Sequence, residues 1–251
     1  MIIDSHSHYD DEAFDDDRYE VIESLNEAGI SSIVSIGCNI ETSKKALEFS
    51  KKYPFIYFTA GFHPEYAQEL DDEAISFLKE MAKEEKMVAI GEIGLDYHYD
   101  TPEREIQKEA FIKQMKLAHS LNLPVNIHCR DAIGDVMDII RKYPGRGIFH
   151  CYSGSVETLK EIVALGYYVS FSGTVTFKNA KNVKESALAV PSDRYLVETD
   201  CPYLSPEPKR GKRNDSRNLV HTLKAIAEIR GIAYEQAVRE TYENTKRVYN
   251  I

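Results

Sequence analysis

The 251-residue sequence predicts a single (β/α)8 TIM barrel, and three observations support this fold class. Short runs rich in Val, Ile, Tyr and Phe recur along the chain, amphipathic stretches separate most of them, and no linker or low-complexity segment interrupts the pattern. Alternating strands and helices are typical of a parallel sheet, and eight such repeats in about 250 residues close into a barrel. We therefore expect one domain over residues 1–251, with its active site at the C-terminal ends of the strands.

The candidate strands follow from the runs of β-branched and aromatic residues. They are Met1–His6, Ser32–Gly37, Ile56–Gly61, Met87–Glu92, Pro124–His128, Gly147–His150, Tyr167–Phe171 and Arg194–Asp200. An open doubly wound sheet is the alternative. However, neither a GxGxxG nor a Walker A motif follows any of these strands, so the barrel is favoured.

The clearest helical pattern covers Pro102–Leu121. Apolar residues recur there at steps of three and four positions, namely Phe111, Met115, Ala118 and Leu121. Pro102 stands where a helix-starting proline is favoured, so we expect the helix to begin there. Two further helical patterns close the chain, at Ser216–Arg230 and Tyr234–Tyr249.

Composition narrows the class of protein. Hydrophobic residues make up 43% and charged residues 29%, as in an ordinary globular protein. The net charge of −10 excludes a protein that binds nucleic acid through overall positive charge. It does not exclude a nuclease with a local basic patch, because bound metal ions add positive charge that the count omits.

The spacing of the cysteines and the N-terminal sequence indicate the cellular compartment of the protein. The four cysteines show no CxxC spacing, so a disulfide scaffold is not expected. The N-terminus has neither a basic nor a long apolar region, and no apolar run approaches the roughly 20 residues that span a bilayer. We expect a cytoplasmic protein with no membrane partner, and nothing indicates an obligate protein partner.

Polar residues gather where the predicted strands end. Five of the eight histidines lie at or just past a strand end, namely His6, His8, His63, His128 and His150. Glu92 and Asp200 end two more strands. Because active-site groups of a parallel barrel lie at this end, these side chains are expected to share one face.

Strand periodicity refines this expectation, since side chains at i and i+2 point the same way. His6 and His8 can therefore chelate one ion, and Asp200 and Glu198 share a side of the last strand. The cysteines that directly follow ligand candidates point the other way and are interpreted as small buried hydrophobic residues; they are Cys129, Cys151 and Cys201.

So many histidines and acids at strand ends predict a metal site, because buried polar groups need partners or metal. Histidine with carboxylate suits Zn, Mn, Fe, Ni or Co, whereas carboxylate with water suits Mg. The number of candidate ligands exceeds the four of a structural zinc site. A two-metal site would use the surplus.

These motifs resemble the TatD-type metal-dependent deoxyribonucleases of the amidohydrolase superfamily. The matching segments span nearly the whole chain in order: Ile3–His8, Gly61–Pro64, Ala89–Tyr97, Asn126–Arg130, His150–Gly154 and Val197–Leu204. The resemblance implies a metal-dependent hydrolase of phosphodiester bonds, a DNA exonuclease. It would use two divalent ions (Mg, Mn, Zn or similar) and a metal-bound hydroxide.

The resemblance also implies roles for individual residues. One metal is held by His6, His8, Glu92 and Asp200, and the other by Glu92, His128 and His150. Glu92 would thus bridge the two ions. Asp200 is also the candidate general base, because a carboxylate beside metal-bound water can take its proton. His63 and Arg130 are then groups on the phosphate side.

Further residues are expected around this centre. Asp4 and Glu198 would orient the ligand imidazoles from behind. Single-stranded or frayed DNA would be contacted by Tyr152 and Tyr203, through stacking, and by Arg210 and Arg213 of the basic loop Lys209–Arg217. The alternatives that stay open are packing tyrosines, a solvated loop and structural ion pairs.

One departure from the family pattern concerns the loop after Asn214. An acidic residue and a proline usually follow there, whereas this chain has Asp215-Ser216, which leaves the loop geometry and the substrate open. The alternative function is hydrolysis of another ester or amide, such as a lactone or an aminoacyl ester, by the same two-metal centre. A metal-binding protein without enzymatic activity is the third hypothesis.

Overall fold

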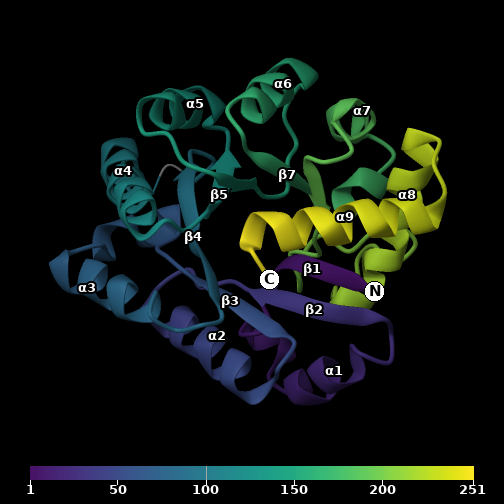
Figure 1. Ribbon diagram of the computed structural model, residues 1–251, viewed down its shortest axis with the longest axis horizontal. Helices are drawn as coiled ribbons and strands as arrows, with labels where there is room; N and C mark the ends of the chain where they lie inside the picture. Colours follow the sequence, from purple (N-terminus) through teal and green to yellow (C-terminus); the bar gives the residue numbers. More distant parts are fainter. Residues whose placement is uncertain (100) are drawn as a thin grey trace. The chain divides into compact units, whose positions relative to one another are not determined.

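The computed structural model describes residues 1–99 and 101–251. Strands and helices alternate along the chain (Figure 1), and the order of the strands in the sheet follows the sequence from β1 to β8. The chain divides into two compact units. Unit 1 comprises residues 1–35, 150–164 and 168–251, and unit 2 comprises residues 36–149 and 165–167. The single domain expected over residues 1–251 stays a prediction.

Unit 1 contains two pairs of parallel strands, β1 with β2 and β7 with β8. The strands are β1 (Ile2–Ser7), β2 (Ile30–Ser35), β7 (Tyr168–Phe171) and β8 (Tyr195–Val197). The helices are α1 (Arg18–Ser24), α6 (Val156–Ala164), α7 (Lys181–Ala189), α8 (Leu219–Arg230) and α9 (Tyr234–Tyr249). A parallel bridge from Ser7 to Cys201 brings the end of β1 beside the segment that follows β8.

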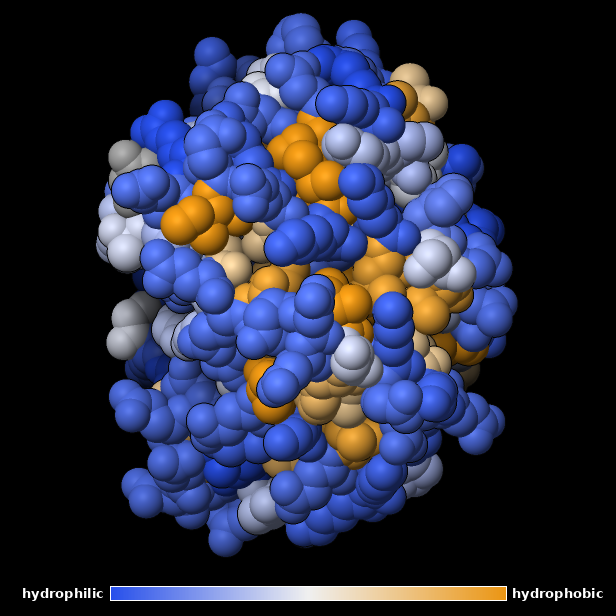
Figure 2. Space-filling model, turned by 90° about the vertical axis from the view of Figure 1, so that its left-hand side faces the viewer, coloured by the Kyte–Doolittle hydropathy of each residue, from blue (hydrophilic) through white to orange (hydrophobic). Residues whose placement is uncertain are grey.

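Unit 2 contains the four middle strands, each paired in parallel with the next. The strands are β3 (Ile56–Ala60), β4 (Met87–Asp96), β5 (Val125–Arg130) and β6 (Gly147–Phe149). The helices are α2 (Ile40–Lys52), α3 (Asp72–Met81), α4 (Arg104–Leu121) and α5 (Ile133–Lys142). Figure 2 shows hydrophilic side chains with apolar ones scattered among them on the side where α3 lies.

Local sequence explains how these helices begin and end. The Asn39 side chain accepts from the Thr42 backbone N–H and Thr42 bonds back, which forms a capping box at the start of α2. α8 is capped by Gly231, whose φ of +63° is a conformation that glycine adopts without a steric penalty. In the described part of the chain, no helix has both the length and the apolar character needed to cross a membrane.

Several predicted boundaries are wrong, and three of them have a clear physical reason. β4 continues past Glu92 to Asp96, because Gly94 lets the backbone approach His128 more closely than a side chain would allow. β8 ends at Val197 instead of at Asp200, which adopts a left-handed φ of +55°. α4 starts at Arg104 after the cap residue Glu103, so Pro102 precedes the helix.

Candidate metal centre and substrate contacts

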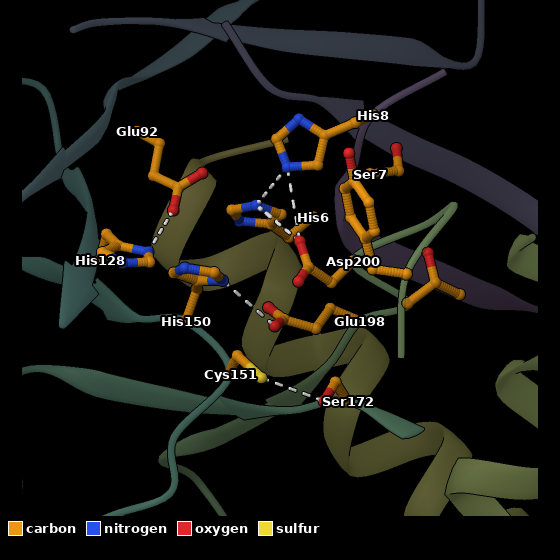
Figure 3. Close-up of polar contacts among 12 residues, drawn as sticks. His6, Ser7, His8, Glu92, His128, His150, Cys151, Ser172, Glu198 and Asp200 are labelled. Atoms are coloured by element: carbon orange, nitrogen blue, oxygen red, sulfur yellow. Dashed lines mark hydrogen bonds and ion pairs between the residues drawn. The ribbon is translucent and has the colours of Figure 1, made fainter. Parts of the chain in front are cut away.

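The first candidate site lies in unit 1, at the end of β1 and after β8. His6 and His8 point the same way, with 3.0 Å between their Nε2 atoms. The Oδ1 atom of Asp200 lies 3.5 Å from Nε2 of His6 and 3.4 Å from Nε2 of His8 (Figure 3). Ligand atoms bound about 2.0–2.2 Å from one metal ion are themselves separated by about 3–3.5 Å. The three donor atoms therefore fit a single ion.

A buried carboxylate connects the two segments that carry these ligands. Asp4 accepts hydrogen bonds from the backbone N–H groups of His6 and Thr199, at 3.3 and 3.0 Å. The hydroxyls of Thr199 and Ser216 donate to its other oxygen, each at 2.6 Å. Asp4 was expected to orient an imidazole ring. In the structure it fastens the segment leading to Asp200 against β1, and its action on an imidazole ring stays a prediction.

Ser216, the position at which the sequence analysis noted a departure from the resembled family's pattern, takes part in this connection. It is fully buried, and its backbone N–H donates to the Tyr9 hydroxyl at 3.0 Å. Its own hydroxyl lies 2.7 Å from that tyrosine oxygen and donates to Asp4. The departure at this position therefore adds hydrogen bonds behind the candidate ligands.

His150 completes the unit 1 cluster. Its ring stacks on that of His6, with centroids 4.0 Å apart and planes 9° from parallel. Nδ1 of His150 lies 3.3 Å from Oε1 of Glu198, which is fully buried and also accepts from the Ser170 hydroxyl. A carboxylate at one ring nitrogen orients the ring and leaves Nε2 for a metal ion. Donor atoms of His6, His150 and Glu198 all lie within 4.8 Å of one another.

The charge state of Asp200 follows from its neighbours. Burial by itself would raise the pKa of this carboxyl. The hydrogen bond with His8 and the nearby imidazoles of His6 and His150 lower the pKa to about 2. Asp200 is therefore a carboxylate at neutral pH, which both a metal ligand and a proton acceptor require.

Unit 2 carries a second cluster, on β4, β5 and the loop after β3. Oε1 of the buried Glu92 lies 2.8 Å from Nδ1 of His128 and 3.8 Å from Nε2 of His63 (Figure 3 shows the first contact). Donor atoms of the three residues lie within 4.8 Å of one another. Imidazole and carboxylate together suit Zn, Mn, Fe or Co, so this group can also contribute to an ion.

Asp96 is a residue of this cluster that the sequence analysis missed. Its Oδ2 lies 3.0 Å from Nε2 of His128, and its Oδ1 accepts from the His98 backbone N–H at 2.9 Å. Burial acts to raise the pKa of Asp96, but these hydrogen bonds lower it below its usual value. Asp96 shares strand parity with Glu92, a signal that was lost because β4 was predicted to end at Glu92.

The predicted phosphate-side residues have different surroundings. Nδ1 of His63 accepts from the Glu65 backbone N–H at 3.3 Å and caps the 3-10 turn Pro64–Glu69, while Nε2 faces Glu92. Arg130 is exposed, with its guanidinium carbon 5.3 Å from the centre of the Tyr99 ring. Arg130 is thus placed at the surface where β5 ends, as a substrate contact requires.

Two of the expected substrate contacts have side chains that already make contacts within unit 1, and their roles toward DNA stay predictions. Tyr152 is only 4% exposed and its hydroxyl donates to the Ser155 carbonyl, so little of the ring is accessible for stacking on a base. Arg213 makes two hydrogen bonds to the carboxylate of Asp17, at 2.7 and 2.6 Å. In contrast, Tyr203 remains 56% exposed, although its hydroxyl donates to Asp11.

The cysteines lie beside the candidate ligands without forming a disulfide. Cys201 is fully buried as expected, whereas Cys129 and Cys151 are only partly buried. The Cys151 sulfur lies 3.1 Å from the Ser172 hydroxyl. Burial raises the pKa of Cys151 to about 12, so it is a neutral thiol.

Comparison with known proteins agrees with this fold and chemistry. A crystal structure of YjjV, a TatD homologue from Escherichia coli K12, aligns with a TM-score of 0.93 and 26% identity, covering 100% of this chain and 98% of that one. The predicted (β/α)8 barrel is thereby confirmed. The YabD protein of Bacillus subtilis, named an uncharacterized metal-dependent hydrolase, is 42% identical over the full length of both chains.

A second relative has a more specific name. The 3'-5' ssDNA/RNA exonuclease TatD of Cronobacter sakazakii is 38% identical over 87% of this chain and 86% of its own length. The model of the TatD-related DNase family matches residues 3–250. The chain therefore belongs to the TatD-related DNase family and is a metal-dependent hydrolase.

Proposed function

We propose that this protein is a two-metal phosphodiesterase that removes nucleotides from the end of single-stranded or frayed DNA. The observation that carries the proposal is the convergence of His6, His8 and Asp200, whose donor atoms lie 3.0–3.5 Å apart. The names of the relatives support the substrate class, since one is an exonuclease on single-stranded DNA and RNA.

The proposed ligand sets follow the family pattern. His6, His8 and Asp200 would hold one ion and His128 and His150 the other, with Glu92 shared between them. The contacts within each unit support these assignments, since every one of these residues lies in a cluster of imidazoles and carboxylates. Divalent ions bound there would supply Lewis-acid activation of water and neutralise charge on the phosphate.

The side chains themselves would have distinct tasks. Asp200 is ionised and would accept the proton of the attacking water. Glu198 would keep the ring of His150 in its ligand orientation, and Asp96 would do the same for His128. Arg130 would bind a phosphate oxygen of the substrate, because its guanidinium is exposed where β5 ends.

The experiment is a metal-dependent nuclease assay with matched alternative substrates. Protein stripped with a chelator is reloaded with Mg, Mn or Zn and incubated with end-labelled single-stranded DNA, a lactone panel and an aminoacyl ester. We expect stepwise shortening of the DNA that requires the added metal. Hydrolysis of a lactone or aminoacyl ester with intact DNA would instead establish the alternative function.

The cytoplasmic location expected from the sequence stays a prediction.

A further inference from the structure

A cavity of about 540 Å³ lies in unit 1, and none of the candidate metal ligands lines it. Two loops line it: the one that follows β7 and its 3-10 turn Gly173–Thr176, and the one that follows β8. Its lining residues are Phe177, Lys178, Asn179, Ala180, Glu207 and Arg210. Both loops leave the C-terminal ends of strands, the end at which the histidines of unit 1 lie. The volume falls within the range of about 300–1,000 Å³ typical of small-ligand sites.

Arg210 differs from the other arginines of the basic loop Lys209–Arg217. Arg213 is paired with Asp17 and Arg217 with Asp215, each through two hydrogen bonds to the carboxylate. Among residues 1–99 and 101–251, no carboxylate lies within ion-pair distance of Arg210 or of Lys178. Neither of the two cations that line the cavity is therefore neutralised by a carboxylate of the described residues.

Stacking and backbone contacts hold Arg210 in place instead. Its guanidinium carbon lies 4.2 Å from the centre of the Phe177 ring. The Glu207 backbone N–H donates to the Thr176 hydroxyl at 2.8 Å, which joins the two loops. A guanidinium that stacks through its face keeps its N–H edges for a ligand. Arg210 is thus positioned without using its hydrogen-bond donors.

We propose that this cavity is a nucleotide subsite, which binds one nucleotide of a single strand at a distance from the scissile bond. Arg210 and Lys178 would contact the phosphate, and Asn179 would hydrogen-bond the base. Glu207 would accept from a sugar hydroxyl or a base amino group, since it repels phosphate. The assignment rests on the proposed nuclease function and deepens it, because it makes turnover depend on the length of the strand.

The test compares DNA strands of two and ten nucleotides with the metal-loaded protein. In the Arg210→Ala/Lys178→Ala variant, we expect kcat/KM for the ten-nucleotide strand to fall about tenfold relative to kcat/KM for the dinucleotide, because charged hydrogen bonds to phosphate are lost. The matched control is Lys224→Ala, which removes one exposed cation from α8, outside the cavity. It should change neither value by more than about twofold. Arg210→Lys should recover part of the loss, since it keeps the charge without the planar fork.

A binding measurement separates the two proposals. Fluorescence anisotropy of a labelled ten-nucleotide strand, measured in chelator so that no cleavage occurs, should show weaker binding by the double variant. The dependence of its binding on salt should also be shallower, by about one phosphate contact or more. If the double variant binds more weakly than wild type but the metal-loaded wild type cleaves no strand, the nuclease function would be contradicted and the subsite would stand. Equal binding and equal length preference in wild type, double variant and Lys224→Ala would overturn the subsite alone.

Discussion

The two histidine clusters are built in different ways. In unit 1, two imidazole nitrogens and a carboxylate oxygen face one another at 3.0–3.5 Å, an arrangement suited to surrounding a cation. In unit 2, each nitrogen of His128 already faces a carboxylate, Glu92 at 2.8 Å and Asp96 at 3.0 Å. The difference indicates that unit 1 supplies converging ligands, whereas unit 2 supplies an imidazole whose orientation the protein itself fixes.

The clusters also differ in the sequence separation of their parts. The unit 2 cluster is assembled largely by neighbouring strands, with β4 and β5 in register at Gly94 and His128. The unit 1 cluster needs Asp200, which lies beyond the end of β8 and is held there by the bonds of Asp4 to Thr199 and Ser216. Its geometry therefore depends on contacts between the two ends of the chain.

The largest effect is expected from Asp200→Asn. The amide keeps the shape but loses the charge and most of the basicity, so kcat should fall about 10²-fold or more. Ions held through His128 should remain, because the ligands in unit 2 are untouched. Steady-state kinetics together with metal analysis check both points. Wild-type kcat with a full metal complement would assign the proton transfer to another group, with His63 the next candidate.

The next largest effect is expected from Glu198→Gln in unit 1 and Asp96→Asn in unit 2, which form a matched pair. Each variant removes the carboxylate charge that orients one imidazole, His150 in unit 1 and His128 in unit 2. Metal affinity should fall about 10–100-fold in both cases. Calorimetric titration of stripped protein with Zn or Mn measures it. A loss in Glu198→Gln alone would mean that Asp96 serves the fold and not the metal.

A moderate loss of stability is expected from Ser216→Ala. The change removes one of the two hydroxyl donors to the same oxygen of the buried Asp4, and also removes a partner of Tyr9. A single buried hydrogen bond contributes about 0.5–1.5 kcal/mol to stability. Urea unfolding measures the change, and Ser76→Ala on the exposed face of α3 is the control. An unchanged midpoint would show that Thr199 alone holds Asp4.

The smallest effect is expected from Arg213→Ala, which breaks the partly exposed pair with Asp17. Such pairs contribute about 0.2–1 kcal/mol. The hydrogen bond from Arg213 lowers the pKa of Asp17, so its contribution is present above the ordinary aspartate pKa of about 3.9 and is lost as the pH falls further. Unfolding at pH 7 and pH 3 should therefore differ less in the variant than in wild type. A wild-type pH dependence in Arg213→Ala would exclude the pair as its source.

Local sequence was sufficient for much of this molecule. Alternating apolar runs predicted the eight strands and the barrel, because burial of one face imposes a period on the residues that form it. The shared direction of His6 and His8 follows from the two-residue repeat of a strand, and their Nε2 atoms lie 3.0 Å apart. These features depend on neighbours within a few positions, so sequence spacing alone reveals them.

Tertiary structure alone decided which polar side chains remain available. The sequence predicts Arg213 as a substrate contact, but in the structure its guanidinium pairs with Asp17, 196 positions away. The sequence predicts Tyr152 as a stacking residue, but packing buries its side chain. The position of Asp200 likewise depends on Asp4, whose contact with Thr199 spans 195 positions. Periodicity carries no information about such pairings, because they form only when distant segments meet. The stacking of Arg210 on Phe177, without an ion pair to a carboxylate of the described residues, also depends on segments that are distant in the sequence.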